Sequence, residues 1–177
     1  MSTNKCDERF RYSDDMLESA IPMPLISIIT PVLNEEAAIG PFLDNLAHLQ
    51  GDFELIVADG GSSDGTVAAI EQCRPEFPAP LTLLTAPTGR GIQMNAGAAV
   101  TRGDILLFLH VDCTIPDDAL FVIKKACETD GVVGGAFRQS FPDPDLFFVL
   151  SSGIVNLLAK YTGIFFGDFG IFIKKEF

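Results

Sequence analysis

Short apolar runs alternate along the chain with stretches whose apolar residues recur at helical spacing. The apolar runs predict buried strands at residues 25–31, 53–58, 81–85 and 105–109. The intervening stretches predict helices, the last of which follows Pro116 and extends to about Glu128. Strands that alternate with helices indicate an α/β fold with a mostly parallel sheet and right-handed crossovers.

Helix ends can also be placed from the sequence. The first helix carries an apolar stripe formed by Ile39, Phe42, Leu43, Leu46 and Leu49. We expect Asn34 to cap this helix and Gly51 to end it. At the next helix, which carries Val67 and Ile70, the capping residue is either Ser63 or Asp64.

Polar residues follow three of the predicted strands directly. They are residues 31–35, residues 59–61, and the triplet His110-Val111-Asp112. The carboxyl ends of parallel strands meet at one edge of a sheet, where α/β proteins bind their ligands. The sequence therefore predicts a binding site formed by these three clusters.

The alternation becomes less regular after residue 130. We expect a strand at residues 134–141, an apolar helix at 145–160 and a further strand at 170–174. Ser151, Ser152, Gly153 and Asn156 interrupt the apolar helix, and a bilayer-spanning helix needs about 20 apolar residues. We therefore expect this helix to pack on the domain, with docking at a membrane interface as the alternative.

The two ends of the chain divide it into a leader and a single domain. Residues 1–23 are polar without clear periodicity, which predicts a mobile N-terminal leader before a domain at 24–177. The leader lacks the basic-then-apolar pattern of a signal peptide, and the four cysteines are scattered. These features favour a cytoplasmic protein with reduced thiols, and leave open a location at the inner face of the membrane.

The formal net charge of the chain is -12, which disfavours binding of other anions. Nucleic acid is excluded as a partner, because neutralising its phosphates requires clustered lysines and arginines. A nucleotide ligand is itself an anion. An acidic protein that binds a diphosphate is therefore expected to recruit a divalent cation between the two.

The turn after the second strand permits a different reading. Residues 61–65 match G-x-S-x-G, the motif that exposes a nucleophilic serine, here Ser63, in α/β hydrolases. The downstream histidine would be His110, with Asp104 as the acid between them. A single strand precedes the strand that leads into this motif, where hydrolases have several, and an HGGG-type oxyanion segment is absent, so we keep the serine hydrolase as a remote alternative.

Four motifs in order resemble family 2 glycosyltransferases of the GT-A fold. They are SIITPVLNEE at residues 27–36, IVADGGSSDGT at 56–66, GRGIQMNAGA at 89–98 and LFLHVD at 107–112. Together with Gly167-Asp168, they resemble most a small bacterial subgroup found alongside radical-SAM and selenium-related genes. The resemblance implies a Rossmann-like GT-A domain that transfers a sugar from a nucleotide diphosphate-sugar to an acceptor hydroxyl, with inversion.

The resemblance also implies roles for individual residues. The residues expected to bind the nucleotide are Pro31, Leu33, Asn34, Glu35, Asp59, Arg90, Asn95 and His110. Asp112 stands where the family carries a metal-binding carboxylate, which implies Mn²⁺ or Mg²⁺ as the cofactor. The alternatives are that Asn34 and Asp64 serve as caps, that Asn95 is a buried amide satisfied by backbone, and that His110 shapes the pocket.

The catalytic base and the acceptor are the least specified parts of this reading. Family members supply the base from a Glu-Asp pair well downstream, and the chain ends at Phe177 before such a pair. Asp168 is the late carboxylate that we carry as a candidate base. We expect either a truncated enzyme or a short, non-catalytic nucleotide-sugar binding module. The donor would be UDP- or GDP-linked, and the apolar segment is compatible with a lipid-linked acceptor.

Overall fold

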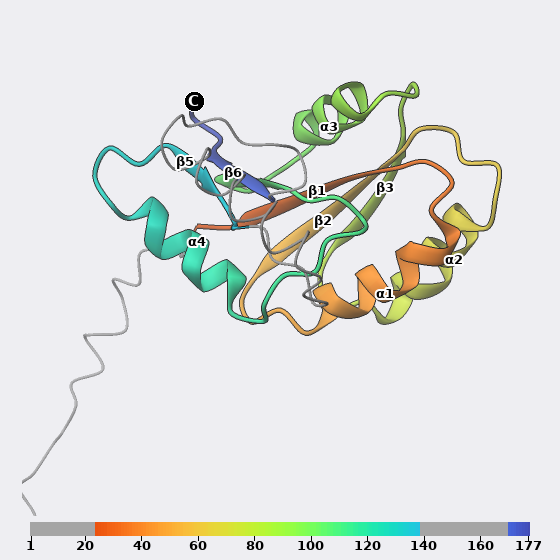
Figure 1. The fold of residues 1–177 in the computed structure, drawn as a ribbon, viewed down its shortest axis with the longest axis horizontal. Coiled ribbons are helices and arrows are strands. Elements are labelled where there is room, and N and C mark those ends of the chain that lie inside the picture. The colour runs from red at the N-terminus through yellow and green to blue at the C-terminus, as the bar shows by residue number, and fades with distance from the viewer. Residues whose placement is uncertain (1–23, 139–169) are drawn as a thin grey trace, which may run out of the picture.

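The computed structural model describes residues 24–138 and 170–177, which form a sheet with helices on both faces (Figure 1). The strand order is β3-β2-β1-β4-β6-β5. The strands are β1 (Ile26–Val32), β2 (Phe53–Asp59), β3 (Leu81–Thr85), β4 (Ile105–Phe108), β5 (Gly134–Ala136) and β6 (Ile171–Lys174). The predicted α/β class and the first four strands are confirmed, with ends shifted by one residue or less.

The sheet is parallel at its centre and antiparallel at one side. β1 pairs in parallel with β2 and with β4, and β2 pairs in parallel with β3. β6 runs antiparallel to both β4 and β5. Because β2 and β4 flank β1 on opposite sides, the chain leaves β1 and β4 in different directions, which opens a crevice at their carboxyl ends.

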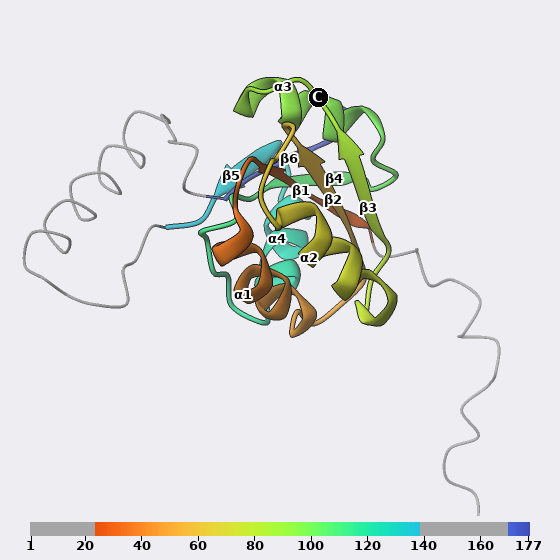
Figure 2. The ribbon, with the colours of Figure 1, turned by 90° about the vertical axis from the view of Figure 1, so that its right-hand side faces the viewer.

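Helices cover the two faces of the sheet unequally (Figure 2). One face carries α1 (Glu36–Ala47), α2 (Thr66–Cys73) and α4 (Ala119–Cys127), and the opposite face carries α3 (Arg90–Ala99). A short 3₁₀ turn, η2 (Arg74–Glu76), follows α2. The stripe predicted for the first helix is buried, and it packs with the even-numbered side chains of β1 in the main core.

α3 lies unusually close to the sheet. A Cβ atom added at Gly97 would come within 2.6 Å of Cγ2 of Ile29 on β1, which is closer than real Cβ contacts. Glycine at this position therefore lets the helix backbone approach the strands, and this approach holds the start of α3 beside the carboxyl end of β1.

Several predicted element ends differ from the structure. The first helix ends at Ala47 rather than near Gly51, which instead has a positive φ of 109° in the turn before β2. The last predicted helix is α4, which starts at Ala119, after Pro116 as expected, and ends at Cys127, one residue before the predicted end. Of the strand predicted at 134–141, residues 134–136 form β5. The helix predicted at 145–160 lies outside the described residues.

A buried carboxylate joins β1, β2 and the loop before β4. Glu54 accepts hydrogen bonds from Ser27 Oγ at 2.7 Å, from the Arg102 backbone N–H at 2.6 Å and from Arg102 Nε at 2.9 Å. Burial raises the pKa of Glu54, but these donors outweigh it and hold the pKa below its usual value. Charge-assisted hydrogen bonds thus fix the amino-terminal edge of the sheet.

Glu54→Gln is expected to weaken the pH dependence of stability. Because the pKa of Glu54 is lower in the folded than in the unfolded chain, its stabilisation is complete above about pH 4.3 and is lost as the pH falls through the folded-state pKa. Urea unfolding at pH 7 and at pH 3.5 should therefore show a smaller loss of stability in the variant. Glu71→Gln, in an exposed ion pair with Arg74, is the control and should keep the wild-type pH dependence. Equal pH dependence in Glu54→Gln and wild type would contradict this assignment.

Candidate nucleotide site

A cavity of about 330 Å³ opens at the carboxyl ends of β1 and β4, beside the start of α3. Its lining residues are Pro31, Val32, Leu33, Glu35, Thr88, Gly89, Arg90, Gln93, His110, Val111 and Asp112. The structure thus brings together six of the residues that the sequence pointed to, namely Pro31, Leu33, Glu35, Arg90, His110 and Asp112. A cavity of this size at this position suits part of a nucleotide.

The turn after β4 presents a buried histidine and an exposed carboxylate. The Leu109 N–H still donates to the Ile29 carbonyl at 3.0 Å, and the chain then turns so that the Cys113 N–H donates to the His110 carbonyl at 3.1 Å. His110 is 7% exposed, whereas Asp112 is exposed. The imidazole therefore forms part of the cavity wall, and the Asp112 carboxylate lies at its solvent-accessible rim.

The N-terminus of α3 forms the opposite wall. Gly89 precedes the helix with a φ of 137°, a conformation that side chains other than glycine rarely adopt. Arg90 is the first residue of this ten-residue helix, and it is exposed. The first backbone N–H groups of a helix and an arginine side chain both favour an anion at this place.

Gln93 and Thr88 line this cavity but were not among the predicted site residues, and Gln93 is the more important of the two. It is 2% exposed, and its Nε2 donates to the carbonyls of Val32 and Ala58, at 2.8 Å each. Its Oε1 accepts from the Gly89 N–H at 3.2 Å. One side chain thus ties the ends of β1 and β2 to the start of α3. The sequence held one signal for this role. Gln93 stands four residues before Gly97, so both residues lie on the face of α3 that meets the sheet.

Asp59 ends β2, but its carboxylate is engaged by the following turn. Its oxygens accept from the Gly61 N–H at 3.0 Å, from the Ser62 N–H at 3.1 Å and from Ser62 Oγ at 2.6 Å. Asp59 is 4% exposed and is not among the residues that line the cavity. The structure therefore shows Asp59 as the residue that shapes this turn, and its contact with a base stays a prediction.

Asn34 does not cap the first helix, which corrects that expectation. It has a left-handed φ of 56°, and its Oδ1 accepts from the Ser63 N–H at 2.8 Å. The Asn34 N–H in turn donates to Ser62 Oγ at 2.9 Å. The asparagine side chain is directed to the neighbouring loop rather than to its own helix, so it joins the turns that follow β1 and β2.

The N-termini of α1 and α2 cap each other, so neither Ser63 nor Asp64 occupies the predicted N-cap position. The N-cap residues are Glu35 and Gly65, and neither makes a side-chain cap bond. Asp64 accepts from the Thr66 N–H of α2 and from the Glu36 N–H of α1, while Glu36 accepts from the Gly65 N–H. The Thr66 hydroxyl and amide groups hold the pKa of Asp64 below its usual value.

The hydrolase alternative finds no support in this geometry. The Ser63 hydroxyl lies 3.3 Å from Asn34 Oδ1, an acceptor that cannot act as a general base. The loop that carries Ser63 is bound to the loop after β1, whereas His110 belongs to the cavity wall. The G-x-S-x-G match therefore reflects the small and polar residues of a tight turn and does not mark a nucleophile.

One further predicted site residue lies elsewhere. Asn95 is exposed on α3 and does not line the cavity. The expectation that Asn95 is a buried amide is therefore wrong, and Gln93 is the buried amide of this helix instead. Asp168 lies outside the described residues.

The residues at the cavity fit a metal that is shared with a ligand. Within residues 24–138 and 170–177, no group of three or more histidine, cysteine or acidic side chains is placed to hold a metal ion by itself. Asp112 supplies one hard oxygen donor at the rim, and His110 supplies a borderline nitrogen donor nearby. Such a sparse donor set suits a cation whose remaining ligands are phosphate oxygens and water.

Comparison with known families agrees with this site. The family model described as glycosyl transferase family 2 matches residues 27–174. These residues include β1 from Ser27 onward, the other five strands and the whole lining of the cavity. The protein is therefore a member of glycosyl transferase family 2, with the GT-A fold that the motifs predicted.

The chain also matches curated relatives. The chain is 29% identical over 156 residues to an undecaprenyl-phosphate 4-deoxy-4-formamido-L-arabinose transferase of Photorhabdus laumondii, with 84% of this chain and 48% of the relative covered. It is 31% identical over 140 residues to a glucosyl-3-phosphoglycerate synthase of Mycolicibacterium smegmatis, with 70% and 44% covered. The chain thus spans about half the length of the curated relatives it matches.

Solved structures share the fold. A mannosyltransferase from Pyrobaculum calidifontis, in complex with GDP-Man and Mn²⁺, superposes with a TM-score of 0.67 at 22% identity, covering 86% of this chain and 45% of that one. The glucosyl-3-phosphoglycerate synthase of Mycobacterium tuberculosis, in complex with Mn²⁺, UDP and glucosyl-3-phosphoglycerate, gives 0.60 at 22% identity, covering 97% and 64%. At this identity, the likeness establishes the fold.

Proposed function

We propose that the protein transfers a sugar from a nucleotide diphosphate-sugar to an acceptor hydroxyl, with inversion at the anomeric carbon. The observation that carries this proposal is the 330 Å³ cavity, which joins the N-terminus of α3 to the His110–Asp112 turn. The cationic Arg90 and several hydrogen-bonding groups line this space together with the carboxylates of Glu35 and Asp112. That arrangement suits a diphosphate held between an arginine and a shared metal ion.

The donor would be held by groups from both walls. The Arg90 guanidinium and the first N–H groups of α3 bind the diphosphate oxygens. Residues Pro31 to Glu35 face the base and ribose. Asn34 and Asp59 contribute mainly by fixing the two loops, through their hydrogen bonds to Ser62 and Ser63.

Asp112, with His110 beside it, would hold Mn²⁺ or Mg²⁺. The cation supplies Lewis-acid stabilisation of the diphosphate leaving group. In support, two structural neighbours carry Mn²⁺ together with a nucleotide or nucleotide-sugar. Because His110 is 7% exposed, packing fixes its imidazole, whereas Asp112 is exposed and its carboxylate accepts from the neighbouring Cys113 Sγ at 3.7 Å.

The acceptor is proposed to be lipid-linked. The curated relatives named as undecaprenyl-phosphate transferases support this class of acceptor, and a cytoplasmic site at the inner face of the membrane would give access to it. No helix within the described ranges is long and apolar enough to cross a membrane. Membership of the radical-SAM-associated subgroup stays a prediction from the sequence motifs.

Calorimetric titration of UDP and GDP, each with and without Mn²⁺, tests the proposal. We expect one nucleotide to bind, with an affinity that Mn²⁺ increases, and the better nucleotide names the donor class. A transfer assay with the matching sugar nucleotide then separates an enzyme from a non-catalytic binding module. Failure of both nucleotides to bind under all four conditions would contradict the nucleotide site itself.

Asp168→Asn is expected to separate catalysis from binding. Inverting transfer requires a base that deprotonates the acceptor hydroxyl as it attacks, and Asp168 is our candidate for this role. We expect kcat to fall by about 10² to 10⁴, with the affinity for the donor unchanged. Donor affinity is measured by the same titration, so a variant that binds less donor, or one with normal kcat, would remove Asp168 from this role.

A further inference from the structure

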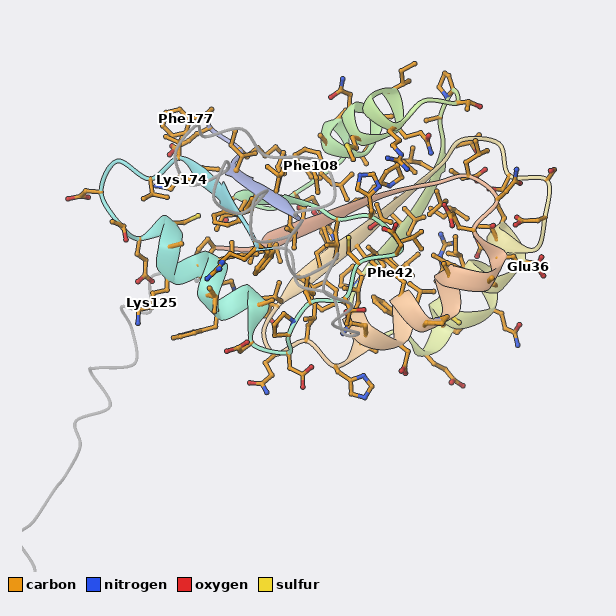
Figure 3. All side chains as sticks on the ribbon, in the orientation of Figure 1. Glu36, Phe42, Phe108, Lys125, Lys174 and Phe177 are labelled. Atoms are coloured by element: carbon orange, nitrogen blue, oxygen red, sulfur yellow. The ribbon has the colours of Figure 1, made fainter. Side chains whose placement is uncertain are left out.

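A second cavity, of about 550 Å³, lies at the opposite edge of the sheet from the nucleotide site. It is formed where β1 and β4 begin, where β6 ends and where α4 makes its last turn. Because β6 is antiparallel to β4, its carboxyl end reaches this edge. Figure 3 shows Lys174 of β6 and Lys125 of α4 at one end of the molecule and Glu36, beside the nucleotide site, at the other.

This cavity gathers positive charge in an acidic protein. Four of the 12 lysines and arginines of the chain line it, namely Arg102, Lys124, Lys174 and Lys175. Three acidic residues also line it, and one of them, Asp104, already accepts from the Leu25 N–H at 3.2 Å. In a chain with a net charge of -12, a cavity with more basic than acidic lining residues stands out as an exception.

Lys124 is the residue for which the fold itself provides no explanation. It is 6% exposed, and its side chain makes no hydrogen bond or ion pair with the part of the chain that the structure describes. Its nitrogen is not among the fully enclosed atoms that lack a partner, so it reaches the open space of the cavity. Its place in the last turn of α4 suits the helix dipole, but that effect does not require burial.

The other three basic residues differ in how they are held. Arg102 is bound to Glu54 through Nε, and Lys175 Nζ donates to the Thr101 carbonyl at 2.6 Å. Lys174 lies near the thiol of Cys127 on α4. Burial raises the pKa of that thiol, and the positive charge of Lys174 opposes the increase. Lys174 of β6 and Lys124 of α4 thus line the same cavity.

We propose that this cavity binds a soluble, phosphorylated small molecule, with the ammonium groups of Lys124 and Lys174 on its phosphate. A buried lysine without a protein partner is stabilised when a bound anion supplies the missing charge. The volume of about 550 Å³ is much larger than a phosphate needs and lies in the range of small-molecule sites, so the ligand has an organic part as well. This site is separate from the nucleotide site and does not depend on the function proposed there.

The thiol of Cys127 provides a local reporter, because it lines the cavity and is 9% exposed. The wild-type protein is alkylated with neutral iodoacetamide, with and without inorganic pyrophosphate, and mass spectrometry follows each cysteine peptide. Chelator removes divalent ions, so that the nucleotide site is not loaded. At pyrophosphate concentrations about ten times its Kd, we expect alkylation of Cys127 to slow about tenfold. Alkylation of the exposed Cys73 should not change.

Matched lysine variants decide whether the protection comes from this site. Lys124→Met should lose the protection, while Lys125→Met, an exposed neighbour that does not line the cavity, should retain it. If circular dichroism shows that Lys124→Met is unfolded, Lys174→Gln serves as the second variant and should also lose the protection. Absence of protection in the wild type, or full protection in a folded Lys124→Met, would overturn the proposal. Protection by phosphatidylglycerol vesicles without protection by pyrophosphate would overturn the soluble ligand and assign the site to a lipid headgroup.

Discussion

Asp112→Ala is expected to abolish the stimulation of nucleotide binding by Mn²⁺ and to reduce transfer by at least about a hundredfold. Asp112 and Glu35 are the carboxylates that line the cavity, and Asp112 is the one on the turn that carries His110. The described residues offer no group of three ligands that could replace it. A metal that neutralises a diphosphate contributes several kcal/mol, and each 1.4 kcal/mol is about a tenfold change in affinity or rate. Calorimetry with the preferred nucleotide measures the first effect, and a transfer assay measures the second.

Asp52→Ala is the matched control for this experiment. Asp52 is an exposed carboxylate just before β2, at the edge of the sheet away from the cavity. The two variants remove the same charge, so a general effect of net charge on nucleotide binding would appear in both. If Asp112→Ala binds the nucleotide with the wild-type manganese dependence, the metal is held elsewhere, and the assignment of the family's metal position to Asp112 is wrong.

The parallel half of the fold was predictable because its signals are local. Each buried strand is a short apolar run, and the stripe on α1 that begins with Ile39 repeats within a few residues. The antiparallel side depends on pairing between distant segments. β6 enters the sheet between β4 and β5, although it follows them in the chain. No local pattern specifies that insertion, since a strand of four residues carries almost no information about its neighbour.

The site was predictable to the extent that strand ends position it. The motifs after β1 and β4, and the start of α3, were expected to converge, and the cavity brings them together. What the sequence could not supply was the direction of individual side chains. The left-handed backbone of Asn34 turns its amide away from α1, and the turn after β2 folds back on Asp59. Both outcomes depend on backbone dihedrals that a residue type permits but does not impose.

Gln93→Leu is expected to damage both stability and nucleotide binding, although Gln93 is almost completely buried at the cavity wall. Leucine has a similar size and helix propensity, so packing changes little. The carbonyls of Val32 and Ala58 and the N–H of Gly89 would each lose the partner that Gln93 provides. The Val32 carbonyl keeps a second donor, the Gly60 N–H at 2.9 Å. A hydrogen bond contributes about 0.5–1.5 kcal/mol, so the loss of three is expected to lower the free energy of unfolding by about 2–4 kcal/mol, measured with urea. The start of α3 would also lose its connection to β1, so Kd for the nucleotide should rise about tenfold or more.

Gln72→Leu makes the same chemical change at an exposed position on α2, and its free energy of unfolding should stay within about 0.5 kcal/mol of wild type. Comparing Gln93→Leu with Gln93→Glu separates the two roles of the amide. A glutamate retains an acceptor for Gly89 but cannot donate to the carbonyls of Val32 and Ala58 when ionised, so it should be at least as damaging as leucine. Near-normal stability in both Gln93 variants would show that the three backbone groups find other partners. The position of α3 would then depend on its close packing at Gly97 rather than on this amide.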